Sequence, residues 1–218
     1  MLAEKVSSPF PSGAVDLTWP VEMYESTDGG RTWGERTDVE IPWDDSFPFF
    51  IECDFEQMPD GRILAASRIE WNYELDDNPL PYPPGKMPND HAAGHMVLTE
   101  SSDEGRTWST FLEFLNYSEV QGQLTLLRDG RLLCTYTHDH LPFGVAAVLS
   151  HDYGRTWDHD NAFQLAWSNG GCTGWSTTRE LPDGALVTIH ALEPYDIEPK
   201  DSGRTVCHSV RWELPEGE

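Results

Sequence analysis

One eight-residue pattern occurs three times in this chain and constrains its fold more than any other feature. The pattern is Ser-x-Asp-x-Gly-Arg-Thr-Trp, and its copies occupy residues 26–33, 101–108 and 150–157. A motif that recurs along a chain indicates a repeat architecture, in which each repeat is one supersecondary unit. We therefore expect a series of similar units within one domain.

Each repeated position has a physical role in a turn. The Asp carboxylate can accept hydrogen bonds from backbone N–H groups just downstream, which closes a tight turn. The Gly adopts backbone angles that other residues resist, and the Trp brings apolar area to the core while its indole N–H serves as a polar group. The motif thus predicts a hairpin turn, and its Asp residues are expected to be structural rather than catalytic.

A second repeat runs in step with the first. An Asp-Gly pair stands between two apolar segments at residues 60–61, 129–130 and 183–184. Asp-Gly flanked by apolar runs is a strong signal for a β-hairpin. We expect strands before these turns at 49–57, 118–127 and 173–181, and strands after them at 62–69, 131–137 and 185–191.

Two further strands complete each repeat. A third strand leads into each eight-residue motif, at 18–25, 95–100 and 145–150, and a fourth follows the Trp, near 109–115 and 161–167. Residues 204–212 are interpreted as the third strand of a last repeat, and no segment shows the apolar periodicity of a helix. Four antiparallel strands in about 45 residues match the size of a propeller blade.

These strands predict an all-β fold that forms part of a β-propeller. Successive blades receive two, four, four and three strands, about half of a six-bladed ring. Residues 1–218 are expected to form one partial propeller domain, with an inserted loop at about residues 70–94. Because open sheet edges invite pairing, we expect either a truncated chain or a ring that a second copy completes as a homodimer.

The charge of the chain restricts its partners. The sequence has 38 acidic and 14 basic residues, a formal net charge of −24, so neither nucleic acid nor a membrane is an expected partner. The cysteine spacings fit no zinc pattern, and we expect no metal and no cofactor.

The start of the chain lacks a signal-peptide pattern. The protein is expected to be cytoplasmic if Met1 is the true start, and secreted or periplasmic if the N-terminus is truncated.

The eight-residue motif between the third and fourth strands, with the paired Asp-Gly hairpins, resembles the sialidase superfamily of Asp-box (BNR) propellers. The resemblance covers nearly the whole chain from about residue 18. The segment from Gly174 to Pro215 is similar to the end of bacterial sialidase-like proteins, which favours the C-terminal half of such a protein. The resemblance implies an exo-acting glycoside hydrolase of exo-α-sialidase type. It also implies that the eight-residue motifs, the Asp boxes, lie away from the active face.

Aligning the repeats on their Asp-Gly turns identifies candidate site residues. Glu52, Gln121 and Trp175 share one position, eight residues before the Asp, and Arg68 lies eight residues after it. Glu52 and Arg68, with the Asp-Gly turn between them, are similar to a unit of the family in which a Glu and an Arg stand on adjacent strands. Glu119 matches the first part of a second such unit.

The predicted site has two sets of residues. The expected acids, bases or acceptors for sugar hydroxyl groups are Glu52, Glu119 and His138. Arg68 is expected to hold an anionic or polar group and Trp175 to stack on a sugar ring. The full set expected to bind substrate is Arg68, Gln121, Trp175 and His190.

Structural roles compete with these functional ones. Glu52, Asp54 and Glu56 alternate along one strand, so they are expected to share a face, and polar lining of a wet central channel is the alternative to a role in binding or catalysis. Arg68 has a similar alternative, in which it pairs with Glu52 or Glu70 instead of a substrate carboxylate.

The resemblance to sialidases is incomplete at the catalytic residues. Sialidases use a tyrosine nucleophile, a glutamate that activates it, an aspartate acid/base and three arginines. Here Trp175 stands where the tyrosine belongs, and Tyr136-Thr137-His138 stands where a further arginine would be wanted. The aspartate belongs to a blade that this chain does not contain. Three alternatives remain: a glycosidase with altered chemistry, a non-catalytic propeller that binds glycan or protein, or a decayed or incomplete gene product with no function alone. The expected partner is a carbohydrate or glycoconjugate.

Overall fold

A computed structural model describes residues 21–34, 36–39, 49–70, 95–109, 112–115, 119–138, 143–168, 174–192 and 206–215 of the chain. These residues form the described part of the protein, and the fold and its contacts are those of this part. The predicted inserted loop falls almost entirely outside it, because β4 continues to Glu70 and the described chain resumes at His95.

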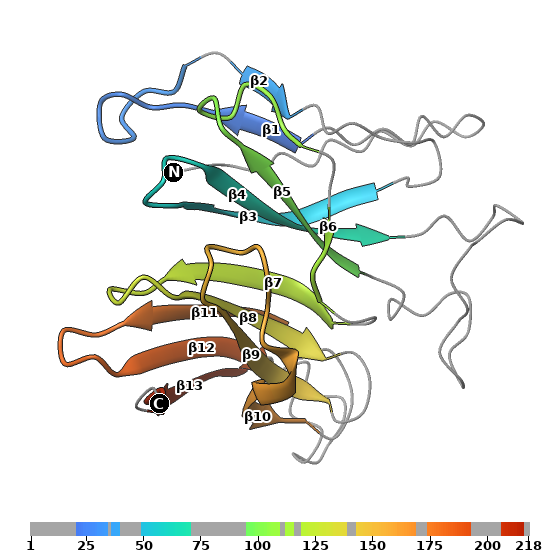
Figure 1. Ribbon diagram of the computed structural model, residues 1–218, viewed down its shortest axis with the longest axis vertical. Helices are drawn as coiled ribbons and strands as arrows, with labels where there is room; N and C mark the ends of the chain where they lie inside the picture. Colours follow the sequence, from blue (N-terminus) through green and yellow to red (C-terminus); the bar gives the residue numbers. More distant parts are fainter. Residues whose placement is uncertain are drawn as a thin grey trace, which may run out of the picture.

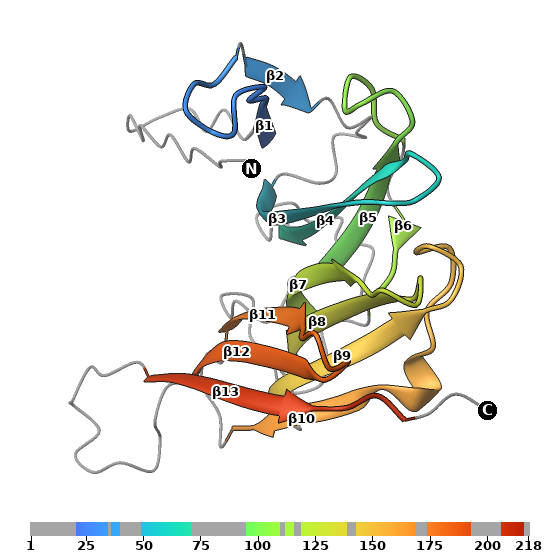
Figure 2. The ribbon, with the colours of Figure 1, turned by 90° about the vertical axis from the view of Figure 1, so that its left-hand side faces the viewer.

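Four antiparallel sheets follow one another along the chain (Figures 1 and 2). An N-terminal sheet contains β1 (Val21–Tyr24) and β2 (Arg36–Val39). We call the other three sheets the first, second and third blades. The first contains β3 (Phe49–Gln57), β4 (Ile63–Glu70), β5 (His95–Ser101) and β6 (Leu112–Glu113). The second contains β7 (Glu119–Leu126), β8 (Leu132–His138), β9 (Gly144–Ser150) and β10 (Phe163–Trp167). The third contains β11 (Gly174–Glu180), β12 (Leu186–Leu192) and β13 (Val206–Trp212).

This arrangement confirms the predicted all-β architecture. In the first and second blades each strand pairs with the next one along the chain, and the inner strand β7 contacts both β3 and β11. The blades are therefore arranged side by side with β3, β7 and β11 as their inner strands. The helical content of the described part is one 3₁₀ turn, η2 (His159–Asn161). Within that part, no helix has the length and apolar character needed to span a membrane.

Apolar packing between blade faces forms the core. One cluster joins the first and second blades and includes Leu64, Met96 and Leu132. A second cluster joins the second and third blades and includes Leu133 and Leu186. Successive residues of β8 thus serve opposite interfaces, as alternation in a strand requires. Every residue of β8 and β9 is buried, because both faces of the second blade are covered.

The Asp boxes form the hairpin turns that the sequence predicted. In the third box, Asp152 Oδ1 accepts hydrogen bonds from Thr156 N at 2.8 Å and from Ser150 Oγ at 2.9 Å, and Asp152 Oδ2 accepts one from Thr156 Oγ1 at 2.7 Å. The same bonds occur around the first two aspartates, Asp28 and Asp103. They lower the pKa of each of these two carboxyl groups to about 2, with the side-chain bond from the box threonine as the largest cause.

The box tryptophans differ in how much area they bury. Trp108 is 5% exposed and lies edge-on to Phe55, with ring centroids 5.6 Å apart, whereas Trp33 is 37% exposed. Trp108 closes the four-stranded first blade and packs on its inner strand. The N-terminal sheet has two strands in the described part, so Trp33 has less sheet to cover. The expectation that each box tryptophan packs in the core therefore holds for Trp108 and fails for Trp33.

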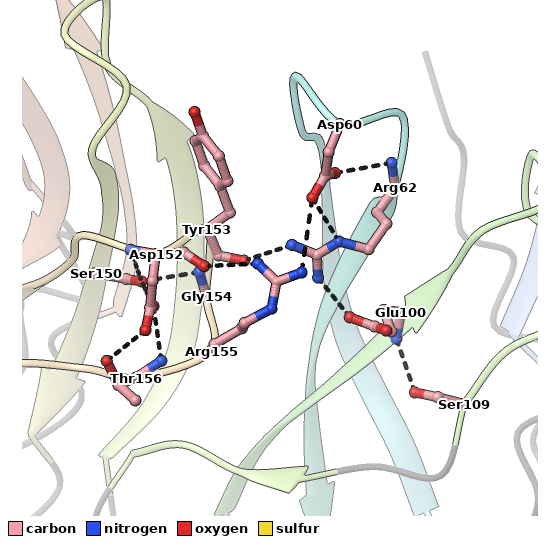
Figure 3. A network of polar contacts seen from close by, with 10 residues as sticks. All are labelled: Asp60, Arg62, Glu100, Ser109, Ser150, Asp152, Tyr153, Gly154, Arg155 and Thr156. Atoms are coloured by element: carbon pink, nitrogen blue, oxygen red, sulfur yellow. Dashed lines mark hydrogen bonds and ion pairs between the residues drawn. The ribbon is translucent and has the colours of Figure 1, made fainter.

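Arginines link neighbouring blades at the end that carries the boxes. Figure 3 shows Arg62, beside the first Asp-Gly turn, in ion pairs with Asp60 and Glu100 of its own blade. The same guanidinium donates a hydrogen bond of 3.2 Å to the Tyr153 carbonyl in the Asp box of the second blade. Arg62 is 8% exposed. A charge buried this far needs such partners, so it joins the first hairpin firmly to the second blade.

Substitution of Asp152 by alanine is expected to destabilise the fold by about 1 kcal/mol. The change leaves the N–H of Thr156 without its acceptor and removes the bonds from two hydroxyl groups, and a hydrogen bond to a charged group contributes roughly this much or more. Thermal or urea denaturation measures the effect. Asp160→Ala, at an exposed residue of η2 close by in the sequence, is the matched control. Equal stability of the two variants would contradict a structural role for the box.

Candidate functional site

The same irregularity interrupts the inner strand of every blade. The pairing register shifts between Ile51 and Asp54 in β3, between Val120 and Gln123 in β7, and between Gly174 and Thr177 in β11. At each shift one residue has a left-handed backbone: φ is 56° at Glu52, 56° at Gln121 and 51° at Trp175.

These left-handed residues are the three that the alignment on the Asp-Gly turns placed together. A side chain larger than glycine pays about 1–2 kcal/mol for this conformation, and β-bulges of this kind re-aim side chains next to functional sites. The repeat of the same strained bulge in three blades therefore marks this level of the blades as a candidate site.

The candidate site lies at the end of the blades opposite the Asp boxes. Glu119 pairs in register with His138, and Gly174 pairs with Ala191 beside His190, at the ends of the hairpins far from the Asp-Gly turns. Arg68, paired with Ile51 next to Glu52, is at the corresponding end of the first blade. All seven predicted site residues thus lie at one end.

Glu52 and Arg68 form an ion pair across the first two strands. Arg68 Nη1 and Glu52 Oε2 are 2.9 Å apart, and the side chains are 24% exposed for Glu52 and 7% for Arg68. The structure shows the pairing of Arg68 with Glu52, which is one of the roles that the sequence left open for Arg68. A buried guanidinium with a carboxylate partner stays charged and is fixed in direction.

Glu119, His138 and Tyr136 form a second buried group, in the second blade. Glu119 and His138 are 3% and 8% exposed, and His138 Nδ1 lies 3.9 Å from Glu119 Oε1. The Tyr136 and His138 rings are 5.2 Å apart. Burial raises the pKa of the Tyr136 phenol far above its usual value, and the charge of Glu119 and a hydrogen bond with it add to the shift. Tyr136 is therefore a neutral phenol beside a carboxylate at all ordinary pH.

These two groups face the same interface between blades. Along β4, Arg68 lies on the same face as Leu64 and Ala66, because residues two positions apart share a face. Along β8, His138 lies on the same face as Tyr136 for the same reason. Leu64, Ala66 and Tyr136 belong to the one cluster that joins the first and second blades. At its end opposite the boxes, this apolar interface thus becomes a polar layer of one arginine, two glutamates, a histidine and a tyrosine.

Two carboxylates of β3 have a different role from the one their spacing suggested. The bulge at Glu52 breaks the alternation, so Glu52 does not form one row with Asp54 and Glu56. Asp54 Oδ2 accepts a hydrogen bond of 2.7 Å from Leu124 N, and Glu56 Oε2 accepts one of 3.3 Å from Leu126 N. Both carboxylates therefore accept hydrogen bonds from backbone N–H groups on the edge of the next inner strand, β7. They act as links between the blades.

Gln121 and Trp175 connect the second and third blades. Gln121 Oε1 accepts hydrogen bonds from Thr137 Oγ1 at 3.3 Å and from Trp175 N at 3.2 Å. The Trp175 side chain is 61% exposed. A Cβ atom on Gly174 would come within 2.7 Å of Gln121 Oε1, so a larger residue there would displace the glutamine amide. Trp175 is thus held by its backbone and presents its indole ring to solvent.

His190 is the least accessible of the predicted residues. It is 2% exposed, its ring lies 5.8 Å from that of His208, and its Nδ1 is 3.3 Å from the Ala191 carbonyl oxygen. Burial, more than any other cause, lowers the pKa of His190. The structure thus places a neutral imidazole behind the surface that presents Trp175.

Comparisons with known proteins agree with this geometry. No family model matches the chain. A sialidase of Clostridium perfringens is 26% identical over 161 residues, which are 72% of this chain and 39% of the sialidase. Among solved structures, a protein of unknown function from Dyadobacter fermentans aligns over 90% of this chain and 50% of its own, with a TM-score of 0.64 and 16% identity. An α-L-arabinofuranosidase of Fusarium graminearum bound to arabinobiose aligns over 90% and 55%, with a TM-score of 0.62 and 15% identity.

The chain has the sialidase-like propeller fold. A Hadza microbial sialidase supports this too, with a TM-score of 0.56 and 18% identity over 90% of this chain and 40% of its own. The chain spans about two fifths of the length of the sialidases and about half of the length of the other two proteins. The expectation of a partial propeller is confirmed on this basis.

In this sialidase-like propeller, sequence reasoning missed two features of the candidate site. In the sequence, Tyr136 belongs to a stretch marked only by the lack of an arginine, and its contact with Glu119 depends on pairing across β7 and β8. The bulges were missed because Glu, Gln and Trp do not signal a left-handed backbone. The available signal for the bulges is that Glu52, Gln121 and Trp175 each stand eight residues before the Asp of an Asp-Gly turn.

The substitution Asp54→Asn is expected to make the fold more stable at neutral pH relative to the parent chain. Burial raises the pKa of Asp54 from 3.8 to about 6. Between these values the folded chain holds a proton that the unfolded chain has lost, so this group's contribution to stability is complete below pH 4 and is lost as the pH rises through 6. Asparagine keeps an oxygen acceptor for Leu124 N and has no charge to desolvate.

Urea denaturation of both chains from pH 4 to 8 measures this difference. The free energy of unfolding of the variant, relative to the parent, should rise between pH 4 and 6 and level off above about 6. The slope in that range is at most about 1.4 kcal/mol per pH unit. Asp160→Asn is the exposed control. A difference that falls with pH would show that the Asp54 pKa is lowered instead.

Proposed function

We propose that this chain forms part of the active face of a sialidase-like, exo-acting glycoside hydrolase. The observation that carries the proposal is the buried polar layer between the first and second blades, in which Glu52, Arg68, Glu119, Tyr136 and His138 lie at the end opposite the Asp boxes. Buried charged groups cost free energy unless they are paired, so an ordinary structural interface would favour apolar residues here.

The chemistry of this layer suits hydrolysis of a glycosidic bond. Arg68, aligned by Glu52, supplies a fixed positive charge that binds an anionic or polar group of a sugar. Glu119 lies where a carboxylate can act as acid or base, and the His138 Nδ1 atom lies 3.9 Å from its Oε1 atom. The Tyr136 phenol, which stays protonated, donates a hydrogen bond to Glu119.

The alternative is a propeller that binds glycan or protein without cleaving it. Trp175 favours this alternative, because it occupies the position at which the family has its tyrosine nucleophile, and an indole cannot attack a sugar. Its 61% exposure suits stacking on a sugar ring in either case. Carbohydrate binding is thus common to both proposals, and turnover distinguishes them.

The outer face of the third blade carries exposed apolar area. Val187, Ile189 and Ala191 alternate along β12 on the face opposite the second blade, and Ile189 is 46% exposed. Because the chain spans about half of the proteins it resembles, we propose that a blade of a second copy covers this face.

Light scattering on the purified chain tests this assembly, and the expected mass is that of a dimer. Ile189→Lys places a charge on the face and should shift the equilibrium towards monomer, whereas Arg106→Lys, in an Asp box, should leave it unchanged. A monodisperse monomer of the parent chain at all concentrations would exclude the second copy as the cover.

Turnover of a panel of fluorogenic glycosides, including α-sialosides and α-L-arabinofuranosides, is the test of the enzymatic proposal. Glu119→Gln keeps the size of the side chain and removes its charge, so kcat should fall by about 100-fold or more, the usual contribution of an acid or base. Glu104→Gln, at an exposed glutamate in an Asp box, is the matched control and should retain full activity.

Two outcomes would change the conclusion. An active parent chain whose Glu119→Gln variant keeps its activity removes Glu119 from the site. A folded parent chain that turns over no glycoside but binds glycans supports the non-catalytic alternative.

A further inference from the structure

The two most exposed large apolar side chains of the described part are both tryptophans, Trp167 at 68% and Trp175 at 61%. They belong to consecutive strands, β10 and β11, in different blades. Single exposed apolar residues are common on protein surfaces. Two such indoles at the end that carries the candidate site indicate a binding surface more specifically than single exposed residues do. Trp167 has no part in the function proposed above.

Strand register places Trp167 relative to the candidate site. Glu119 pairs with His138, His138 pairs with Gly144, and Gly144 pairs with Trp167. These four residues form one row across the second blade, from its inner strand β7 to its outer strand β10. Three steps of the strand spacing, roughly 4.8 Å each, separate Trp167 from Glu119 by about 14 Å. The row carries a carboxylate at its inner end, an indole at its outer end, and between His138 and Trp167 a residue without a side chain.

The backbone that carries Trp167 is held by specific contacts. The register of β10 shifts between Gln164 and Ala166, and the Gln164 side-chain amide donates to the Ala166 carbonyl oxygen at 2.6 Å. Just after the tryptophan, Ser168 N donates to the Phe143 carbonyl oxygen at 2.9 Å. A Cβ atom on Gly144 would overlap the Ala166 carbonyl oxygen. The backbone that carries the exposed indole is thus fixed on both sides of Trp167.

We propose that Trp167 forms a second sugar-binding subsite, so that this face binds an oligosaccharide that extends outward from Glu119 to the rim of the second blade. The inference rests on the proposed function and adds to it the class of substrate. An indole offers a flat apolar surface and an N–H donor, which fits the apolar face and the hydroxyl groups of a sugar ring. The separation of about 14 Å, which is three strand spacings, exceeds the length of one sugar ring, so a ligand that reaches both ends contains more than one sugar residue. The strongly acidic chain favours a neutral sugar over an anionic group at this outer position.

Titration calorimetry with two sets of probes tests the subsite. The first set is L-arabinose and α-1,5-linked arabino-oligosaccharides of increasing length. The second is free N-acetylneuraminic acid and sialyllactose. The parent chain should bind the longer member of one set about tenfold or more tighter than the corresponding monosaccharide. Trp167→Ala should remove this gain and leave monosaccharide binding unchanged, whereas Trp175→Ala should weaken both.

Trp33→Ala is the matched control, because Trp33 is also exposed but belongs to an Asp box at the other end of the sheets. Trp167→Phe keeps an aromatic face and should retain most of the gain. Thermal denaturation establishes that each variant is folded.

The outcomes separate the subsite from the proposed function. Monosaccharide binding without any gain from chain length, or a gain that survives Trp167→Ala, overturns the subsite and leaves the proposed function in place. No binding of any probe overturns both. An equal loss in Trp167→Ala and Trp33→Ala assigns the effect to stability and also overturns the subsite.

Discussion

Face-to-face packing of the second blade against its two neighbours is the interaction on which the rest of the structure depends. β8 and β9 are buried along their full length, with alternate side chains in two different apolar clusters. This packing holds three inner strands side by side and puts the hairpin turns at one end. The opposite end thereby collects the ends of strands from different blades, where side chains from distant parts of the sequence meet. Glu52 and Glu119, for example, reach the same end of one interface although 67 positions separate them.

The two ends of the blades use their polar groups differently. At the Asp boxes, each aspartate is saturated by hydrogen bonds from its own turn, and Arg62 is held by Asp60, Glu100 and a carbonyl oxygen. Such closed networks stabilise a fold and leave little capacity for a ligand. At the other end, the bulged strands impose a left-handed backbone on Glu52, Gln121 and Trp175 at a cost of about 1–2 kcal/mol each. Because this strain recurs in three blades, it is a property of the scaffold. Each blade presents a different side chain at the bulge.

The sequence was sufficient for the architecture because its signals are local. Asp-Gly pairs and Asp boxes specify turns through bonds within a few residues, and alternation between the turns gives the strands, so β3 has the bounds that were predicted for it. The sequence predicted which residues belong to the candidate site but not how they contact one another. The ion pair of Glu52 with Arg68 follows from one hairpin, whereas Tyr136 beside Glu119 and Asp54 on the β7 backbone depend on a bulge and on packing between blades. A bulge shifts alternation by one residue, and no local pattern of Glu, Gln or Trp encodes it.

The position of Asp54 shows how the site and the stability of the scaffold are connected. Its carboxylate binds the N–H of Leu124 on the edge of β7, and β7 also carries Glu119 and Gln121. A free strand edge at the centre of the fold would leave backbone donors unsatisfied, and each such donor costs about 1–3 kcal/mol when buried. Asp54 and Glu56 satisfy two of them, but a carboxylate placed there is desolvated, and the pKa of Asp54 rises to about 6. The inner strands are thus joined by ionisable side chains, and the link from Asp54 to β7 changes its charge in the pH range in which Asp54 titrates.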